Sequence, residues 1–188
     1  MGLSDEQLIN RVKAGDQPAF GQLIDRYQAY VFSLCLKVLE NREEAEEAAQ
    51  DVFIKVFQRI RSFRHDSRFS TWLYTLAYRT AIDHRRQVAR HRTSKNSVEV
   101  DIALIGKGVP AEVEKNLQQQ EQQAQLKALL ARLPQQEATI IDLFYLQEQS
   151  VKEIAKIMKL SVSNVKTKLF RTREKLRNLM QPHSSTDA

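Results

Sequence analysis

Aromatic and cationic side chains are concentrated in the segment RSFRHDSRFSTWLY, which runs from Arg61 to Tyr74. Core segments carry few charges and solvated loops carry few aromatics, so this mixture indicates a ligand. Unstacked nucleic-acid bases lie against aromatic rings, while arginines bind the phosphate backbone. The segment and the arginine-rich stretch after it therefore predict a site for opened nucleic acid. The residues expected to form it are Phe63, Arg64, Arg68, Tyr74, Tyr78 and Arg86.

Part of this segment also has a structural interpretation. Phe69 and Trp72 fall on one helical face with several aliphatic residues, which predicts that these two rings pack in a core. Phe63 lies in the loop before that helix, and Tyr74 and Tyr78 point away from the apolar face. These last three rings are therefore expected to remain available to a ligand.

A second group of basic residues occupies two amphipathic segments near the C-terminus, separated by the turn Lys159–Ser161. Two short helices joined in this way predict a helix-turn-helix. In the first, the inward positions are Ile154, Ala155 and Met158; in the second, they are Val162, Val165, Leu169, Leu176 and Leu179. The opposite face of the second helix suits the major groove of DNA. Its candidate duplex-binding residues are Ser163, Asn164, Lys166, Thr167, Phe170, Arg171 and Arg173.

Individual chemistry can be assigned on this face. Arg171 can pair with both acceptors of a guanine, and Phe170 can contact a thymine methyl group. The flanking cations are expected to bind phosphates; they are Lys168, Arg173, Lys175 and Arg177. The alternative is an ordinary helical hairpin with a solvated basic face, against which the exposed Phe170 argues.

An acidic and apolar stripe follows the helix that starts after Asn41. Its outward positions are Glu47, Gln50, Asp51, Ile54 and Gln58. Acids near a helix N-terminus complement the helix dipole, which explains much of the charge but not Ile54. The stripe therefore predicts a protein interface, while a single exposed isoleucine is also ordinary on a surface.

Local start signals place the helices that carry these groups. Ser4 with Gln7, and Ser150 with Glu153, match the capping-box pattern. Further starts are expected at Asp16, at Asn41, at Ser70 or Thr71, at about Leu117 and at Pro134. The predicted fold class is all-α, with two helical domains joined by a flexible linker. The expected boundaries are an N-terminal domain at 1–92, a linker at 93–115, a helix-turn-helix domain at 116–182 and a disordered tail at 183–188.

Composition limits the function classes. The chain of 188 residues has a formal net charge of +6, which favours a polyanionic partner. It lacks a membrane-length apolar run and an N-terminal signal pattern, so a cytoplasmic protein is expected. Cys35 is the single cysteine, the four histidines lack paired metal-ligand spacing, and no nucleophile–base pattern appears. We therefore expect no enzyme, no cofactor and no metal.

Three segments resemble one family in order along the chain, the extracytoplasmic-function (ECF) type of bacterial RNA polymerase sigma factor. AEEAAQDVFIKVF is similar to its polymerase-binding helix, SFRHDSRFSTWLYTLAYRTAIDHRR to its melting loop and minus-ten segment, and LPQQEATIIDLFYLQEQSVKEIAKIMKLSVSNVKTKLFRTREKLR to its minus-thirty-five reader. The resemblance implies a transcription initiation factor that directs core polymerase to promoters and helps to melt them. The linker stands where larger sigma factors have a further domain.

The resemblance also implies partners and site roles. Glu47, Gln50, Asp51 and Ile54 would dock on the clamp helices of the largest polymerase subunit, and the C-terminal domain on the flap. Residues 61–68 would hold a flipped base, which adds Asp66 and Ser67 to the site. Arg79 replaces the asparagine usual in this family, so the minus-ten preference is open. An anti-sigma factor is a further expected partner, and membrane insertion is not expected.

Two other functions fit parts of the sequence. A free-standing helix-turn-helix regulator with a dimerising N-terminal domain would bind palindromic duplexes without polymerase. A helical adaptor with basic faces for acidic proteins would show no sequence selectivity.

Overall fold

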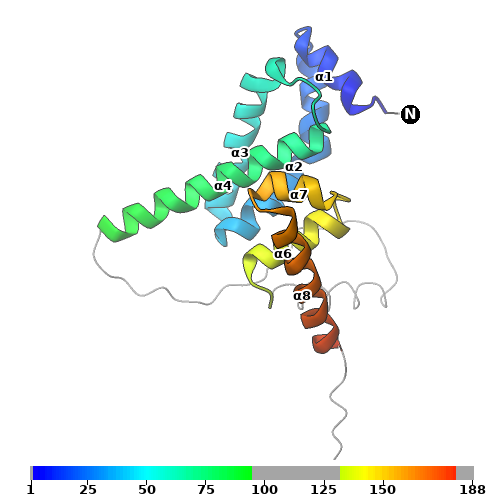
Figure 1. Ribbon diagram of the computed structural model, residues 1–188. Coiled ribbons are helices and arrows are strands. Elements are labelled where there is room, and N and C mark those ends of the chain that lie inside the picture. Colours follow the sequence, from blue (N-terminus) through cyan, green and yellow to red (C-terminus); the bar gives the residue numbers. More distant parts are fainter. Residues whose placement is uncertain (1, 95–131, 181–188) are drawn as a thin grey trace, which may run out of the picture.

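The computed structural model describes residues 2–94 and 132–180, and every regular element within these ranges is helical (Figure 1). The all-α prediction is therefore confirmed for the described residues. Most of the predicted linker 93–115, most of the helix expected from Leu117 to Leu133, and the predicted tail 183–188 lie outside them.

Four α-helices and one short 3₁₀ helix precede the undescribed segment, and three α-helices follow it. They are α1 (Asp5–Lys13), α2 (Gln17–Leu39), α3 (Arg42–Arg59), η1 (Ile60–Ser62), α4 (Phe69–Ser94), α6 (Gln135–Tyr145), α7 (Val151–Met158) and α8 (Val162–Met180).

The local start signals mostly act as predicted. Both capping boxes form: Ser4 with Gln7 begins α1, and Ser150 with Glu153 begins α7. Asp16 accepts a hydrogen bond from the Ala19 N–H at 3.1 Å and so begins α2. Asn41 and Pro134 likewise occupy the N-cap positions of α3 and α6.

The predicted start of α4 is wrong by a few residues. The helix begins at Phe69, and the N–H of Trp72 donates to the carbonyl of Arg68 at 3.2 Å. The Thr71 side chain is fully buried and contacts residues of the C-terminal helices instead of capping its own helix. The Thr71 hydroxyl, which the local pattern assigned to an N-cap, therefore bonds to distant residues instead.

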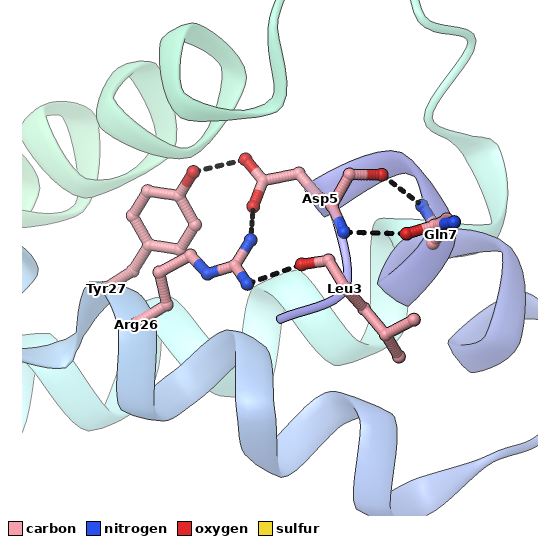
Figure 2. Close-up of polar contacts among 6 residues, drawn as sticks. Leu3, Asp5, Gln7, Arg26 and Tyr27 are labelled. Atoms are coloured by element: carbon pink, nitrogen blue, oxygen red, sulfur yellow. Dashed lines mark hydrogen bonds and ion pairs between the residues drawn. The ribbon is translucent and has the colours of Figure 1, made fainter. Parts of the chain in front are cut away.

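A polar network fastens α1 to α2 (Figure 2). The Asp5 carboxylate accepts from the Arg26 guanidinium and the Tyr27 hydroxyl, and Arg26 also donates to the carbonyl of Leu3 at 2.7 Å. Burial, together with the Asp5 hydrogen bond, raises the pKa of Tyr27 well above its ordinary value. The first helix is thus held by charge as well as by apolar packing.

Helices α2, α3 and α4 form a bundle around an aliphatic core. Val31 and Leu34 of α2, Val52 and Val56 of α3, and Leu73 of α4 are all fully buried. Burying each such side chain contributes about 1.5–3 kcal/mol relative to an exposed one. This packing sets which sides of α3 and α4 remain at the surface.

The C-terminal helices pack on the bundle through α4. Figure 1 shows α4 crossing the molecule between α3 on one side and α7 on the other, in agreement with the contacts of both helices. Helix α6 contacts α2, and α8 packs on α6 and α7. The two helical units therefore share a contact surface in this structure.

Candidate functional site

The helix-turn-helix forms as the sequence predicts. Lys159 ends α7 in the left-handed region at φ 54°, and the Leu160 N–H donates to the carbonyl of Ala155 at 3.0 Å. Ser161 then accepts from the N–H of Asn164 at 3.1 Å, which begins α8. The inner face of α8 is held by Val165, which is fully buried. The turn therefore fixes which face of α8 meets solvent.

The candidate duplex-binding face of α8 is open to solvent. All of its predicted residues are exposed: Ser163, Asn164, Lys166, Thr167, Phe170, Arg171 and Arg173. The Phe170 side chain is 65% exposed. Within the described part of the chain, neither Lys166 nor Arg171 forms an ion pair. This face presents cations, hydroxyls and one aromatic ring together.

Several details of the predicted α8 pattern need correction. Val162 was expected in the core but is 39% exposed, because it is the first residue of α8 and extends past the contact with α7.

Lys175 was expected to bind phosphate but pairs with Glu137 of α6 at 2.8 Å. Arg177 pairs with Glu174 at 2.8 Å. The Arg173 guanidinium lies 5.4 Å from the ring centre of Phe144. The side chain of Leu179 lies outside the described residues.

The interpretation of Phe63 as an available ring is wrong. Its side chain is 6% exposed and lies 5.3 Å from the Trp72 ring and 5.8 Å from the Phe69 ring, measured between ring centres. The Lys13 ammonium donates to the Phe63 carbonyl at 2.7 Å and so holds the loop against α1. Because η1 turns the chain back toward α4, Phe63 completes an aromatic cluster instead of facing solvent. Phe69, at 5% exposed, is buried as predicted, and Trp72 is half-buried.

The polar residues of this loop do face solvent. Arg64, Asp66 and Arg68 are exposed, and Ser67 is half-buried. His65, which sequence reasoning passed over, is exposed at φ 60°, and its ring lies 4.7 Å from that of Phe63. Its place among Arg61, Arg64 and Arg68 was the sequence signal for it. The loop thus presents charges over a buried aromatic floor.

Tyr74 is also placed differently from the prediction. Its side chain is 4% exposed, and its hydroxyl donates to the Gln147 side chain at 2.8 Å. Burial raises the pKa of Tyr74, as expected for a phenol removed from water. Tyr78 is half-buried, whereas Arg79 and Arg86 are exposed. Of the predicted residues on α4, only the two arginines are open to solvent.

The acidic stripe on α3 forms as predicted. Glu47 and Gln50 are exposed, and Ile54 is 55% exposed. The Asp51 side chain is 42% exposed, and its Oδ2 lies 2.9 Å from Nε2 of His84 on α4. The contact with His84 leaves the other carboxylate oxygen of Asp51 for a partner. The stripe therefore combines carboxylates with an apolar side chain at one surface.

An apolar groove adjoins this stripe between α2 and α3. Phe20, Phe32 and Phe53 line it together with Ile54 and Phe57. Phe57 is 52% exposed, on the same side as the groove. Its ring centre lies 5.1 Å from that of Phe20. The surface available to a protein partner is thus wider and more apolar than the sequence pattern indicated.

Residues 2–94 and 132–180 show neither a metal-binding cluster nor a membrane-spanning helix. These residues contain no cluster of three potential metal ligands of the His, Cys, Asp and Glu types. None of the described helices has the length and hydropathy needed to cross a bilayer. Cys35 is buried, and burial raises the pKa of its thiol to about 12.

Comparison with known families divides the chain at the same place as the two helical units. The family model for sigma-70 region 2 matches residues 23–91. The model for sigma-70 region 4 matches residues 123–176. The first range includes α3, the loop and most of α4, and the second includes the helix-turn-helix.

Curated relatives match over nearly their whole length. The ECF RNA polymerase sigma factor SigW of Bacillus subtilis is 34% identical, with 96% of this chain and 99% of the relative covered. The RNA polymerase sigma-H factor of Pseudomonas aeruginosa is 33% identical, with 95% and 94% covered. The ECF RNA polymerase sigma-E factor of Escherichia coli K12 is 33% identical, with 96% of each chain covered.

Solved structures share the fold at lower identity. The sigma factor RpoE, in complex with the anti-sigma factor NepR from Bartonella quintana, is 21% identical with a TM-score of 0.66, covering 85% of this chain and 95% of RpoE. CnrH, in complex with the cytosolic domain of CnrY, has a TM-score of 0.60 and 21% identity, covering 92% and 94%. The chain contains sigma-70 regions 2 and 4 in order, and it matches full-length sigma factors at 33–34% identity. It therefore belongs to the ECF family of RNA polymerase sigma factors.

Proposed function

We propose that this sigma factor uses three separate surfaces to bring core RNA polymerase to a promoter and open it. The exposed face of α8 reads duplex DNA at the minus-thirty-five element. The loop at 61–68 and the exposed arginines of α4 act at the minus-ten element. The stripe on α3 docks on the polymerase. The observation that carries the proposal is the α8 face, where a 65%-exposed phenylalanine stands among exposed hydroxyls and cations on a helix-turn-helix.

Duplex reading is assigned to the central residues of that face. Arg171 can donate two hydrogen bonds to a guanine edge, and Phe170 can pack on a thymine methyl group. Lys166 and Thr167 lie on the same exposed surface one turn earlier. Since Lys175 and Arg177 already have carboxylate partners, the phosphate contacts are assigned to Lys166 and Arg173 instead.

Minus-ten recognition and melting are assigned to exposed cations. Arg64 and Arg68 bind the phosphates of the unpaired strand, with Asp66 and Ser67 as hydrogen-bonding neighbours. Arg79 and Arg86 continue the same track along α4. The aromatic cluster beneath the loop supports this surface as a packed floor.

Polymerase docking is assigned to Glu47, Gln50, Asp51 and Ile54 on α3, with the apolar groove beside them. A partner surface with cationic and apolar groups would fit this combination. The clamp helices of the largest polymerase subunit are the proposed partner, and the polymerase flap is proposed for the C-terminal unit. These partners follow from the family, whose members include the three curated relatives.

Further features complete the proposal. The factor works in the cytoplasm, has no catalytic residues of its own and needs no cofactor. Its domains are 1–92 and 116–182, with 93–115 as the linker and 183–188 as the tail. An anti-sigma factor is proposed as a regulator, since RpoE of Bartonella quintana is described in complex with one. A free-standing regulator is not favoured, because the matched relatives are polymerase sigma factors over their full length.

Reconstitution with core polymerase tests the whole proposal. Gel filtration should show the chain eluting with core polymerase, and transcription from a pool of random promoters should select two separated elements. Asp51→Lys should weaken polymerase binding by several kcal/mol at most, while Glu43→Lys, on the same helix outside the stripe, should bind as wild type. Selection of palindromic duplexes without polymerase would refute the proposal in favour of a free-standing regulator.

A further inference from the structure

A side chain of α1 holds the backbone of the loop at 61–68. The Lys13 ammonium donates to the Phe63 carbonyl at 2.7 Å, although the two residues are 50 positions apart in the chain. The same ammonium lies 5.9 Å from the centre of the Phe63 ring. Figure 1 shows the segment between α3 and α4 passing close to α1, in agreement with the contact between α1 and η1. Lys13 is half-buried, so its cation is engaged with this peptide instead of standing in open solvent.

The carbonyl that Lys13 holds is well placed to orient Arg64. It belongs to the planar peptide that also contains the Arg64 nitrogen, so the hydrogen bond fixes the plane from which the Arg64 side chain starts. His65 follows at φ 60°, with its ring 4.7 Å from the Phe63 ring. A non-glycine residue keeps this left-handed backbone only where its surroundings stabilise it. The direction of the loop is thus set on both sides of Arg64.

Lys13 itself stands on a fixed support. The inner face of α1 is buried in the core through Leu8, Ile9 and Val12. At the start of α1, the Asp5 carboxylate accepts from Arg26 and Tyr27 of α2 (Figure 2). A side chain can position another group only when its own place is fixed by packing and hydrogen bonds. Helix α1 meets that condition at both of its ends.

A second path joins α1 to the aromatic floor beneath the loop. Tyr27, whose hydroxyl donates to Asp5, lies edge-on to Phe69 with ring centres 5.6 Å apart. The Phe69 ring lies 5.7 Å from the Trp72 ring. Helix α1 therefore supports the loop from its backbone and from the cluster below it.

A fixed loop has an advantage for binding a strand that is unpaired only briefly. A cation on a disordered segment must lose conformational freedom when it binds, and that loss weakens the contact. Arg64 is exposed, and the backbone before it is held by Lys13 in the free protein. Most of this ordering is then complete before DNA arrives.

We propose that Lys13 is a positioning residue for promoter opening, which presents Arg64 to the unpaired strand in a fixed orientation. Helix α1 precedes the range 23–91 that matches sigma-70 region 2, so this role lies outside the matched segment. The role in opening rests on the proposed function of the loop. The position of the loop in the free protein does not.

Trp72 reports that position without any DNA. It is the single tryptophan of the chain, and its ring centre lies 5.3 Å from that of Phe63. Lys13→Met keeps the apolar stem and removes the donor, so acrylamide quenching of Trp72 fluorescence should rise by about twofold. Lys13→Arg keeps a cationic donor and should restore wild-type quenching. Arg11→Met is the matched control, because Arg11 is an exposed cation of the same helix that pairs with Asp16.

Opening rates with core polymerase test the functional role. Lys13→Met should slow the opening of duplex promoters by about fivefold, and Lys13→Arg should open them at the wild-type rate. In an Arg64→Ala background, Lys13→Met should have no further effect, because both changes remove the same contact. On a promoter already mismatched at the minus-ten element, Lys13→Met should regain activity, which also shows that the variant is folded and bound to polymerase.

Each result separates one explanation from another. Unchanged Trp72 quenching in Lys13→Met overturns the positioning of the loop. Raised quenching with wild-type opening overturns the role of Lys13 in promoter opening. Additive losses in the double variant would mean that Lys13 contacts DNA itself, which also overturns the inference. If Arg64→Ala opens promoters at the wild-type rate, the proposed function of the loop is refuted together with the role of Lys13 in opening, and Trp72 quenching alone decides the loop position.

Discussion

Two phenylalanines in cation-rich stretches, Phe63 and Phe170, were both expected to face DNA, and the structure treats them in opposite ways. Phe170 on α8 is 65% exposed, whereas Phe63 in the loop before α4 is 6% exposed. Phe170 has Lys166 and Arg171 as neighbours on an outer helix face, while Phe63 has Phe69 and Trp72 within reach.

The difference reflects what each region has to recognise. A duplex groove is present before the protein arrives, so the reading face of α8 can stand ready in solvent. An unpaired base appears only after melting, and aromatic rings without a ligand pack on one another in water. In the free protein, the cations of the melting region are therefore exposed, while its aromatic rings are packed in the fold.

Replacing each phenylalanine with alanine is the largest test of this comparison. Phe63→Ala should lower the free energy of unfolding by about 3 kcal/mol, because it leaves a cavity in the aromatic cluster. Phe170→Ala should change it by less than about 0.5 kcal/mol, since that ring is exposed. Urea unfolding of both variants measures the difference. Equal stability of the two variants would show that the Phe63 ring is not part of the packed core.

The reading face of α8 is tested by its central arginine. Arg171→Ala should weaken binding of polymerase holoenzyme to its promoter by about 1–3 kcal/mol and relax the preference at one base position. Arg177→Ala should keep the selected sequence, because Arg177 is paired with Glu174 at 2.8 Å. Selection from random minus-thirty-five duplexes reports both effects. An unchanged sequence preference in Arg171→Ala would mean that another face of α8 reads DNA.

The exposed cations of the melting loop are tested by a double substitution. Arg64→Ala with Arg68→Ala should slow promoter opening by about tenfold, because two contacts with the unpaired strand are lost. A fluorescent base analogue in the minus-ten element measures the opening rate. On a promoter already mismatched at that element, the variant should recover activity. Wild-type opening on duplex DNA would assign melting to some other part of the chain.

The smallest effect concerns Glu153, where the packed region meets α7. Burial works to raise the pKa of Glu153, but hydrogen bonds from the Ser150 N–H, the Ser150 hydroxyl and Thr71 outweigh it and lower that pKa below 4.5. The stabilising contribution is therefore complete above about pH 4.5 and is lost as the pH falls through the lowered value.

Glu153→Gln is the comparison for this pH effect, because it keeps the side-chain acceptor and removes the charge. Between about pH 6 and pH 3, wild type should lose more unfolding free energy than this variant. Parallel loss of stability in the two proteins would show that the Glu153 carboxylate is equally well hydrogen-bonded in the unfolded chain.

Local sequence determined the helices and the outward face of the reading helix. Capping patterns at Ser4, Asp16, Asn41 and Ser150 act within three residues, so they could be read without knowing the fold. The exposed residues of α8 followed from helical period, since α6 and α7 cover its apolar stripe and leave the polar face in solvent. The acidic stripe on α3 was predictable for the same reason.

Tertiary structure alone decided the fate of the side chains that meet distant partners. Phe63 is buried against α1 and α4, and Tyr74 and Thr71 contact residues of the C-terminal unit more than seventy positions away. Lys37 likewise finds Asp142 across the chain. Helical period shows on which face of a helix a residue lies, but it cannot show whether a distant part of the chain buries that face. Here the loop before α4 buries Phe63, and the contact between the two helical units buries Thr71 and Tyr74. Both contacts depend on long-range packing.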